Sequence, residues 1–161
     1  MSDLLDLRTL STIWHDGPCA EVRVGELVTR YVRRGSGPSV VLAGTDTEAS
    51  PLWAALVESL APRYRLILPK CPPNGVDATA WLKGFIEGIG LESCVLVAGE
   101  PAAAAALELA SGDELIVRKL VLLGNGDREP GSDGSRTLIV RAAWSLNDSL
   151  QRIDEFISSQ D

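Results

Sequence analysis

Carboxylate side chains gather in this sequence where apolar, strand-like runs end. Glu100 follows the run Cys94-Val-Leu-Val-Ala98 and precedes an alanine-rich stretch; the other acidic residues in such positions are Asp46, Glu48, Asp127 and Glu129. In an open α/β sheet the crevice beyond the carboxyl ends of the strands is the usual ligand position. Carboxylates gathered there could bind an amine, or a hard cation that prefers oxygen ligands. The alternative, which we favour, is that they are solvated loop charges and that Glu100 stabilises the N-terminus of a helix.

Other residue types that could do chemistry are sparse. His15, the single histidine, precedes the first expected strand, so we expect it to lie at the surface or in packing rather than to act as a base. Cys19, Cys71 and Cys94 are widely spaced and match no common zinc-site spacing, so we expect reduced structural thiols, with Cys94 in the core. The glycines of Gly124-Asn-Gly126 lack the spacing and helix context of a phosphate loop. The sequence therefore predicts no metal site and no cofactor.

Length and composition fit one globular domain over residues 1–161. Hydrophobic residues make up 45% and charged residues 23%, with a net charge of −7. A negative net charge opposes binding to nucleic acid or an anionic membrane, which requires clustered Lys and Arg. No apolar run approaches the roughly 20 residues that span a bilayer. The acidic start of the chain lacks the pattern of a signal peptide. We expect a cytoplasmic protein without a membrane or nucleic-acid partner.

The spacing of apolar residues predicts alternating strands and helices after an N-terminal helical segment over residues 1–20. Alternation on both sides of Gly25-Glu26 predicts a hairpin of two antiparallel strands. The further strands are expected at Ser39–Ala43, Tyr64–Pro69, Cys94–Ala98, Lys119–Leu123 and Thr137–Val140. Helices are expected at Pro51–Leu60, Val76–Ile89, Pro101–Ala110 and Leu146–Ser158, and residues 124–135 are expected to form a flexible loop. Trp14, Trp53, Trp81 and Trp144 are expected in the core or in a pocket wall.

This order of elements predicts a three-layer α/β/α fold with a mostly parallel sheet. From about Glu21 to Val140 the order also resembles that of the α/β-hydrolase family. The segments that carry the resemblance are Tyr31–Gly44, Val95–Ala110 and Arg118–Leu123. The second of these resembles the strand, nucleophile elbow and following helix of that family.

The elbow is where the resemblance is most informative. In the family, Gly-X-Ser-X-Gly turns sharply from strand to helix, and small residues flank the serine. The five matching positions read Ala98-Gly99-Glu100-Pro101-Ala102, which keeps the small flanks and places Glu100 at the nucleophile position. The next residue normally donates its backbone N–H to the oxyanion, but Pro101 has no N–H. Members of the fold that attack with a carboxylate use aspartate, and they need a histidine to release the ester.

The remaining family positions also depart from the catalytic pattern. The third strand ends in Ala43-Gly44 where the family has His-Gly, and Ala142-Ala-Trp-Ser145 stands where the family has Gly-X-X-Asp. Asp148 is nearby but is expected to begin the last helix, where a carboxylate favours the helix dipole. The last strand and the histidine loop of the family are not found after this point. Only the Gly-rich loop separates Leu123 from Thr137, so no lid domain is expected. The resemblance therefore implies a shortened α/β-hydrolase domain without a catalytic triad.

We expect a non-catalytic protein that binds a partner protein or a small ligand in the remnant active-site crevice. The expected ligand-binding residues are Gly44, Thr45, Asp46, Glu100, Pro101 and Trp144, with Trp144 filling part of the crevice. The first alternative is a small ester or acyl hydrolase with atypical chemistry that uses Glu100. Another alternative is a structural subunit whose partner supplies the missing strand. If the strand order follows the family, Thr137–Arg141 forms a sheet edge, which we expect a homodimer or the N-terminal segment to cover.

Overall fold

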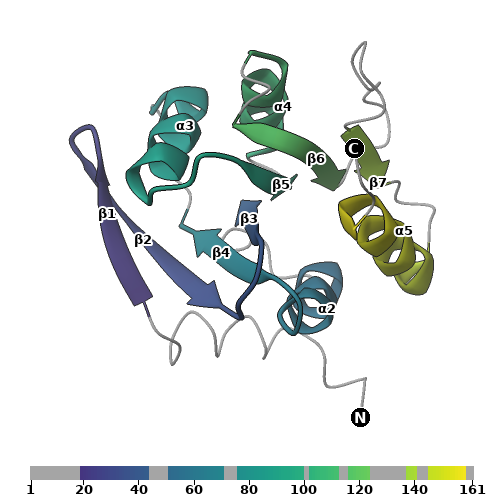
Figure 1. Ribbon diagram of the computed structural model, residues 1–161. Coiled ribbons are helices and arrows are strands. Elements are labelled where there is room, and N and C mark those ends of the chain that lie inside the picture. Colours follow the sequence, from purple (N-terminus) through teal and green to yellow (C-terminus); the bar gives the residue numbers. More distant parts are fainter. Residues whose placement is uncertain are drawn as a thin grey trace.

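The computed structural model describes residues 19–43, 51–70, 76–99, 102–112, 116–123, 137–140 and 145–158 (Figure 1). In this part of the chain seven strands form one sheet. They are β1 (Cys19–Val24), β2 (Leu27–Arg34), β3 (Ser39–Ala43), β4 (Arg65–Pro69), β5 (Cys94–Ala98), β6 (Val117–Leu123) and β7 (Thr137–Val140). The strand order is β1-β2-β4-β3-β5-β6-β7. The expected N-terminal helical segment and the expected loop 124–135 lie outside the described residues, apart from Cys19 and Ala20, which are the first residues of β1.

The sheet is mixed, as the sequence predicts. β1, β2 and β4 pair antiparallel, whereas β4, β3, β5, β6 and β7 pair parallel. Val24 pairs with Leu27, so Gly25-Glu26 forms a two-residue hairpin turn. Gly25 has a φ of 61°, at the position where a type II′ turn requires positive φ and favours glycine. The predicted hairpin is therefore confirmed.

Helices cover both faces of the sheet. Figure 1 shows α3 (Ala78–Gly88) and α4 (Ala103–Gly112) on one side, and α2 (Pro51–Leu60) and α5 (Leu146–Ser158) on the other. Successive strand residues point to opposite faces. Val41 and Ala43 of β3 accordingly belong to the core under α3 and α4, whereas Val40 and Leu42 belong to the core under α2 and α5. The three-layer α/β/α architecture is confirmed.

Two helix starts differ from the prediction. α3 begins at Ala78 rather than Val76, because the Asp77 carboxylate accepts hydrogen bonds from the Thr79 and Ala80 N–H groups (3.1 and 3.2 Å) and caps the helix. α4 begins at Ala103, so the predicted start at Pro101 is two residues too early. α2 and α5 have the predicted bounds. None of the helices in the described part of the chain is long and apolar enough to cross a membrane.

The β1–β2 hairpin is fixed to the body of the protein through α3. The indole Nε1–H of Trp81 donates to the buried Thr29 hydroxyl at 2.9 Å. Phe85 stacks with Trp81 at a centroid distance of 6.0 Å and meets Tyr31 edge-on at 5.3 Å. Aromatic pairs of this kind stabilise the folded state by more than the burial of their apolar area alone would. Residues of β2 and α3 therefore make a continuous packed contact on one face of the hairpin.

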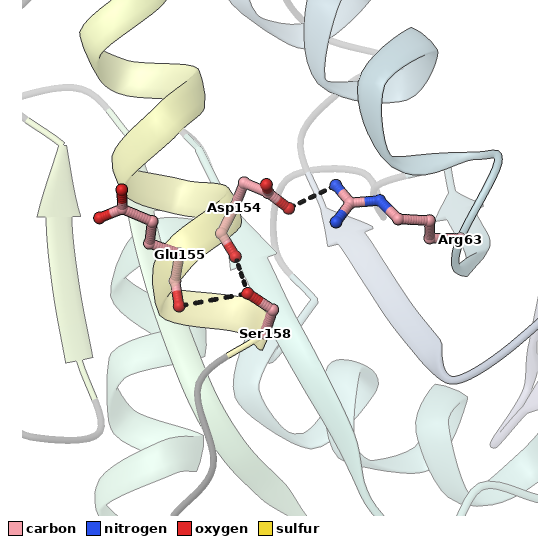
Figure 2. Close-up of polar contacts among 4 residues, drawn as sticks. All are labelled: Arg63, Asp154, Glu155 and Ser158. Atoms are coloured by element: carbon pink, nitrogen blue, oxygen red, sulfur yellow. Dashed lines mark hydrogen bonds and ion pairs between the residues drawn. The ribbon is translucent and has the colours of Figure 1, made fainter.

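α5 is held by contacts to two other parts of the chain. The buried Lys119 of β6 donates from Nζ to the Phe156 carbonyl at 2.8 Å, so a cation sits at the helix C-terminus, which favours the helix dipole. Figure 2 shows the ion pair between Arg63, which follows α2, and Asp154 of α5. In the same view the Ser158 hydroxyl donates to the Asp154 carbonyl at 2.7 Å. The Arg63 pair is exposed and contributes little, so Lys119 is the stronger of the two anchors.

Cys94 lies at the start of β5 and is almost completely buried, as predicted. Loss of solvation raises the pKa of its thiol to about 12, because burial disfavours the thiolate, although the charge of Arg118 opposes the shift. Because the pKa is raised in the native state, there is a pH range in which the Cys94 thiol is protonated in the native protein but ionised in the unfolded chain. The contribution to stability is therefore present below the ordinary thiol pKa of 9.0 and is lost as the pH rises toward 12.

We expect the substitution Cys94→Ala to remove this pH dependence. Between about pH 8 and about pH 10.5, the free energy of unfolding of the wild type should fall by about 2 kcal/mol more than that of the variant. Urea denaturation of both proteins at the two pH values measures the difference. Cys19 and Cys71 are present in both proteins and serve as an internal control. Equal pH dependence of the two proteins would contradict the burial of the thiol.

Candidate ligand site at the carboxyl ends of the parallel strands

The parallel strands end side by side. Ala43 of β3 pairs with Ala98 of β5, Ala98 also pairs with Leu122 of β6, and Leu123 pairs with Val140 of β7. The segments that follow these strands therefore all begin at the same end of the sheet, the edge formed by the carboxyl ends of the strands. Open α/β sheets bind ligands at this end.

Every predicted ligand-binding residue belongs to one of these segments. In sequence, Gly44, Thr45 and Asp46 follow β3, Glu100 and Pro101 follow β5, and Trp144 follows β7. All six lie outside the described residues, as do Glu48, Asp127, Glu129 and His15. The structure thus fixes the strand ends from which the predicted site is built, and the positions of these side chains stay predictions.

The turn after β5 is tight and internally hydrogen-bonded. The Gly99 N–H donates to the Ala43 carbonyl at 2.9 Å, which ties the end of β5 to the end of β3. The Ala102 N–H donates to the Gly99 carbonyl at 2.8 Å, and this bond closes a four-residue turn around positions 100 and 101. The Ala106 N–H then donates to the Ala102 carbonyl at 2.9 Å, which begins the helical pattern of α4. These three bonds link the end of β5 to the start of α4 through Gly99 and Ala102.

Close packing explains why the residues around this turn are small. Ala98, Ala102, Ala103 and Ala106 are all buried. On the other side the indole of Trp53, from α2, lies against Gly99: a Cβ atom added to Gly99 would be 3.1 Å from Cζ2 of that ring. Sequence reasoning assigned Trp53 to the core or a pocket wall but did not connect it with the turn. A tryptophan in the first turn of the helix after β3 is a weak signal for such a contact.

The hydrogen bonds limit what this turn can do chemically. An oxyanion hole needs backbone N–H groups that point at the reacting oxygen. The N–H groups of Gly99 and Ala102 are bonded within the protein, and Pro101 has none. These three residues therefore supply no strong donor to an oxyanion beside residue 100.

The described acidic residues near this edge do not form a second site. Asp148 lies in the first turn of α5, is exposed, and donates its backbone N–H to the Ser145 hydroxyl at 3.1 Å. This confirms the prediction that Asp148 begins the last helix. Among the residues that the structure describes, no three His, Cys, Asp or Glu side chains come together as a metal site requires.

Comparisons with known proteins find similarity in structure only. No protein-family model matches the sequence, and no curated protein matches it. Among solved structures, a proposed lipase from Acinetobacter baumannii is 19% identical with a TM-score of 0.59, over 76% of this chain and 46% of that one. An epoxide hydrolase from Vigna radiata is 19% identical with a TM-score of 0.57, over 70% of this chain and 43% of the other.

A haloalkane dehalogenase from Bradyrhizobium elkani is 21% identical with a TM-score of 0.54, over 66% of this chain and 41% of the dehalogenase. The chain thus matches less than half of the length of each of these proteins. All three have the α/β-hydrolase fold, and the structural similarity to them shows that this chain has the α/β-hydrolase fold as well.

Proposed function

We propose that this protein uses the α/β-hydrolase fold for binding and does not hydrolyse substrates by the serine mechanism. The ligand or partner protein occupies the crevice at the carboxyl ends of the parallel strands, between the segments that follow β3, β5 and β7. The observation that carries the proposal is the turn after β5: residue 100 is glutamate, and the N–H groups of its described neighbours are bonded internally.

The energetic cost of these changes supports a non-catalytic role. One oxyanion donor contributes about 3–4 kcal/mol to transition-state stabilisation in other hydrolases. Pro101 removes the donor that normally follows the nucleophile. An ester formed on Glu100 would also need a histidine to activate the releasing water, and His15, the one histidine in this sequence, precedes β1.

A second candidate is an atypical hydrolase that uses Glu100 as nucleophile or base. It is favoured by the position of a carboxylate in the turn after β5, and by the names of the structural neighbours, which include an epoxide hydrolase and a haloalkane dehalogenase. Its substrates would be esters, epoxides or haloalkanes.

A substrate panel separates the two candidates. We expect wild-type protein, Glu100→Ala and the control Glu108→Ala to give the same background rate with aryl esters, a styrene-type epoxide and a bromoalkane. Glu108 is an exposed residue of α4, so its loss should leave the fold intact. Product formation is followed by chromatography at enzyme excess. Turnover that Glu100→Ala abolishes and Glu108→Ala retains would establish the hydrolase instead.

The binding role predicts where ligands are detected. In two-dimensional NMR spectra, a fragment set that includes primary amines should shift the amide signals of Gly99, Ala102 and Leu123, because these residues border the acidic segments. The signals of Val24 to Leu27, at the hairpin turn, serve as the control. Shifts confined to the hairpin, or spread evenly over the chain, would contradict a site at this edge.

We also propose that β7 forms the contact of a homodimer. It is the last strand in the order of the described sheet, and an unpaired edge strand tends to pair with another chain. Two copies of Thr137–Arg141 could pair antiparallel about a twofold axis. Sedimentation velocity should detect a dimer, and the β7 amides should exchange slowly with solvent. A monomer at all concentrations with fast-exchanging β7 amides would exclude this arrangement.

A further inference from the structure

One face of the β1–β2 hairpin stands apart from the rest of the sheet because its side chains are exposed. We call it the hairpin face and define it by Glu21, Arg23, Val28, Arg30 and the adjoining Lys70. In the strand register Glu21 pairs with Arg30 and Arg23 pairs with Val28. The Lys70 N–H donates to the Arg30 carbonyl at 2.9 Å, so Lys70 extends the row beyond β4. All five residues are exposed.

The helices explain why this face is bare. Thr29 and Tyr31 point to the opposite face, where α3 covers them. Val32 points to the same face as Arg30 and Val28 and is buried in the core that includes Leu56 and Leu60 of α2. The packing against α2 thus ends at Val32. Val28, 48% exposed, is the more exposed of the two large hydrophobic residues found at the surface in the described part of the chain.

The charge of the hairpin face indicates the chemistry of whatever covers it. The chain as a whole carries a net charge of −7, whereas this face holds three cations and one carboxylate around an apolar side chain. Opposite charges across an interface set its register and suppress wrong partners. The complement is a short acidic segment that also presents apolar side chains.

Residues 3–14, which lie outside the described residues, contain two aspartates, one arginine (Arg8) and six large apolar side chains, so this segment is apolar with a slight excess of negative charge. In the helix expected there, Asp3, Leu7, Leu10 and Trp14 share one stripe, because residues four, seven and eleven positions apart lie on the same side. Asp6 is next to this stripe. An apolar stripe that contains carboxylates suits a purely apolar core poorly, because burying an unpaired charge is costly. It suits a surface on which arginine and lysine surround a valine.

The connection to β1 also favours this segment over a separate partner. β1 begins at Cys19, which pairs with Val32, and the Arg23–Val28 pair lies four residues further along, about 13 Å away at 3.3 Å per residue. A helix of residues 3–14 is about 18 Å long at 1.5 Å per residue. With only residues 15–18 between them, the helix can fold back along the hairpin, at a high effective concentration.

We propose that residues 3–14 form an amphipathic helix that docks on the hairpin face of the same chain. Leu7 and Leu10 cover Val28, and Asp3 and Asp6 pair with Arg23, Arg30 or Lys70. This role is distinct from the crevice at the carboxyl ends of the strands, and it leaves β7 to a different partner.

Zero-length cross-linking of the full chain tests the contact. A carbodiimide joins a carboxylate to a neighbouring amine, so mass spectrometry should find the fragment of residues 1–8 joined to Lys70. Lys83 is the control amine, because it is exposed on α3, on the opposite side of the sheet. Hydrogen exchange of the amides of residues 3–14 provides a second readout, and it should be slowed in the wild type.

Two matched variants make the test specific. Val28→Glu places a carboxylate opposite Asp3 and Asp6, and should abolish both the link to Lys70 and the protection of residues 3–14. Val76→Glu changes the other exposed large hydrophobic residue, 38% exposed, and should preserve both. Protection that only Val28→Glu removes supports the proposal even without a link.

Three results would overturn the proposal. The first is equal linking to Lys70 and Lys83, and the second is absence of both the link and the protection, which would leave the face to an acidic partner protein. The third is a link found only between ¹⁴N- and ¹⁵N-labelled copies in a mixed sample, which would assign the contact to a second copy of the chain.

Discussion

The hydrogen bond from the Gly99 N–H to the Ala43 carbonyl joins the end of β3, the middle strand of the sheet, to the end of its neighbour β5. Both strands are buried on both faces, so their side chains are fixed by two cores at once. The Ala102 N–H then donates to the Gly99 carbonyl, which links the end of β5 to the residue that precedes α4. The alignment of the candidate site depends on this junction, since the segments that follow β3 and β5 in the sequence begin there.

The same junction is held by backbone hydrogen bonds and by close packing. The turn is stabilised by hydrogen bonds to Gly99 and Ala102 and by packing against Trp53, and none of these contacts involves the side chain at position 100. A catalytic serine is therefore not needed to hold the turn. Glutamate and proline can occupy its middle positions while the strand, the helix and the small flanking residues are kept.

The sequence predicted the elements whose apolar pattern is long and regular. It was less accurate where one contact determines the end of an element or the burial of a side chain. Continuous apolar runs gave the buried strands, and the stripe of α5 gave its bounds. The start of α3 depends on the Asp77 cap, which the pattern of apolar residues does not contain. The burial of Lys119 was not predicted, because it depends on a register shift between β5 and β6 and on carbonyl groups of α5 that are distant in sequence. The contact of Trp53 with Gly99 is likewise a tertiary feature. The side chains proposed to line the crevice rest on sequence alone.

The anchoring of α5 by Lys119 has a practical consequence for handling the protein. Lys119 is the third residue of β6, so the C-terminal end of α5 lies near the amino end of the parallel strands. The candidate crevice is at their carboxyl ends. An affinity handle or fluorescent label joined beyond Ser158 would therefore be attached near the amino ends of the parallel strands, opposite to the crevice. Immobilisation through such a handle would present the crevice to solution.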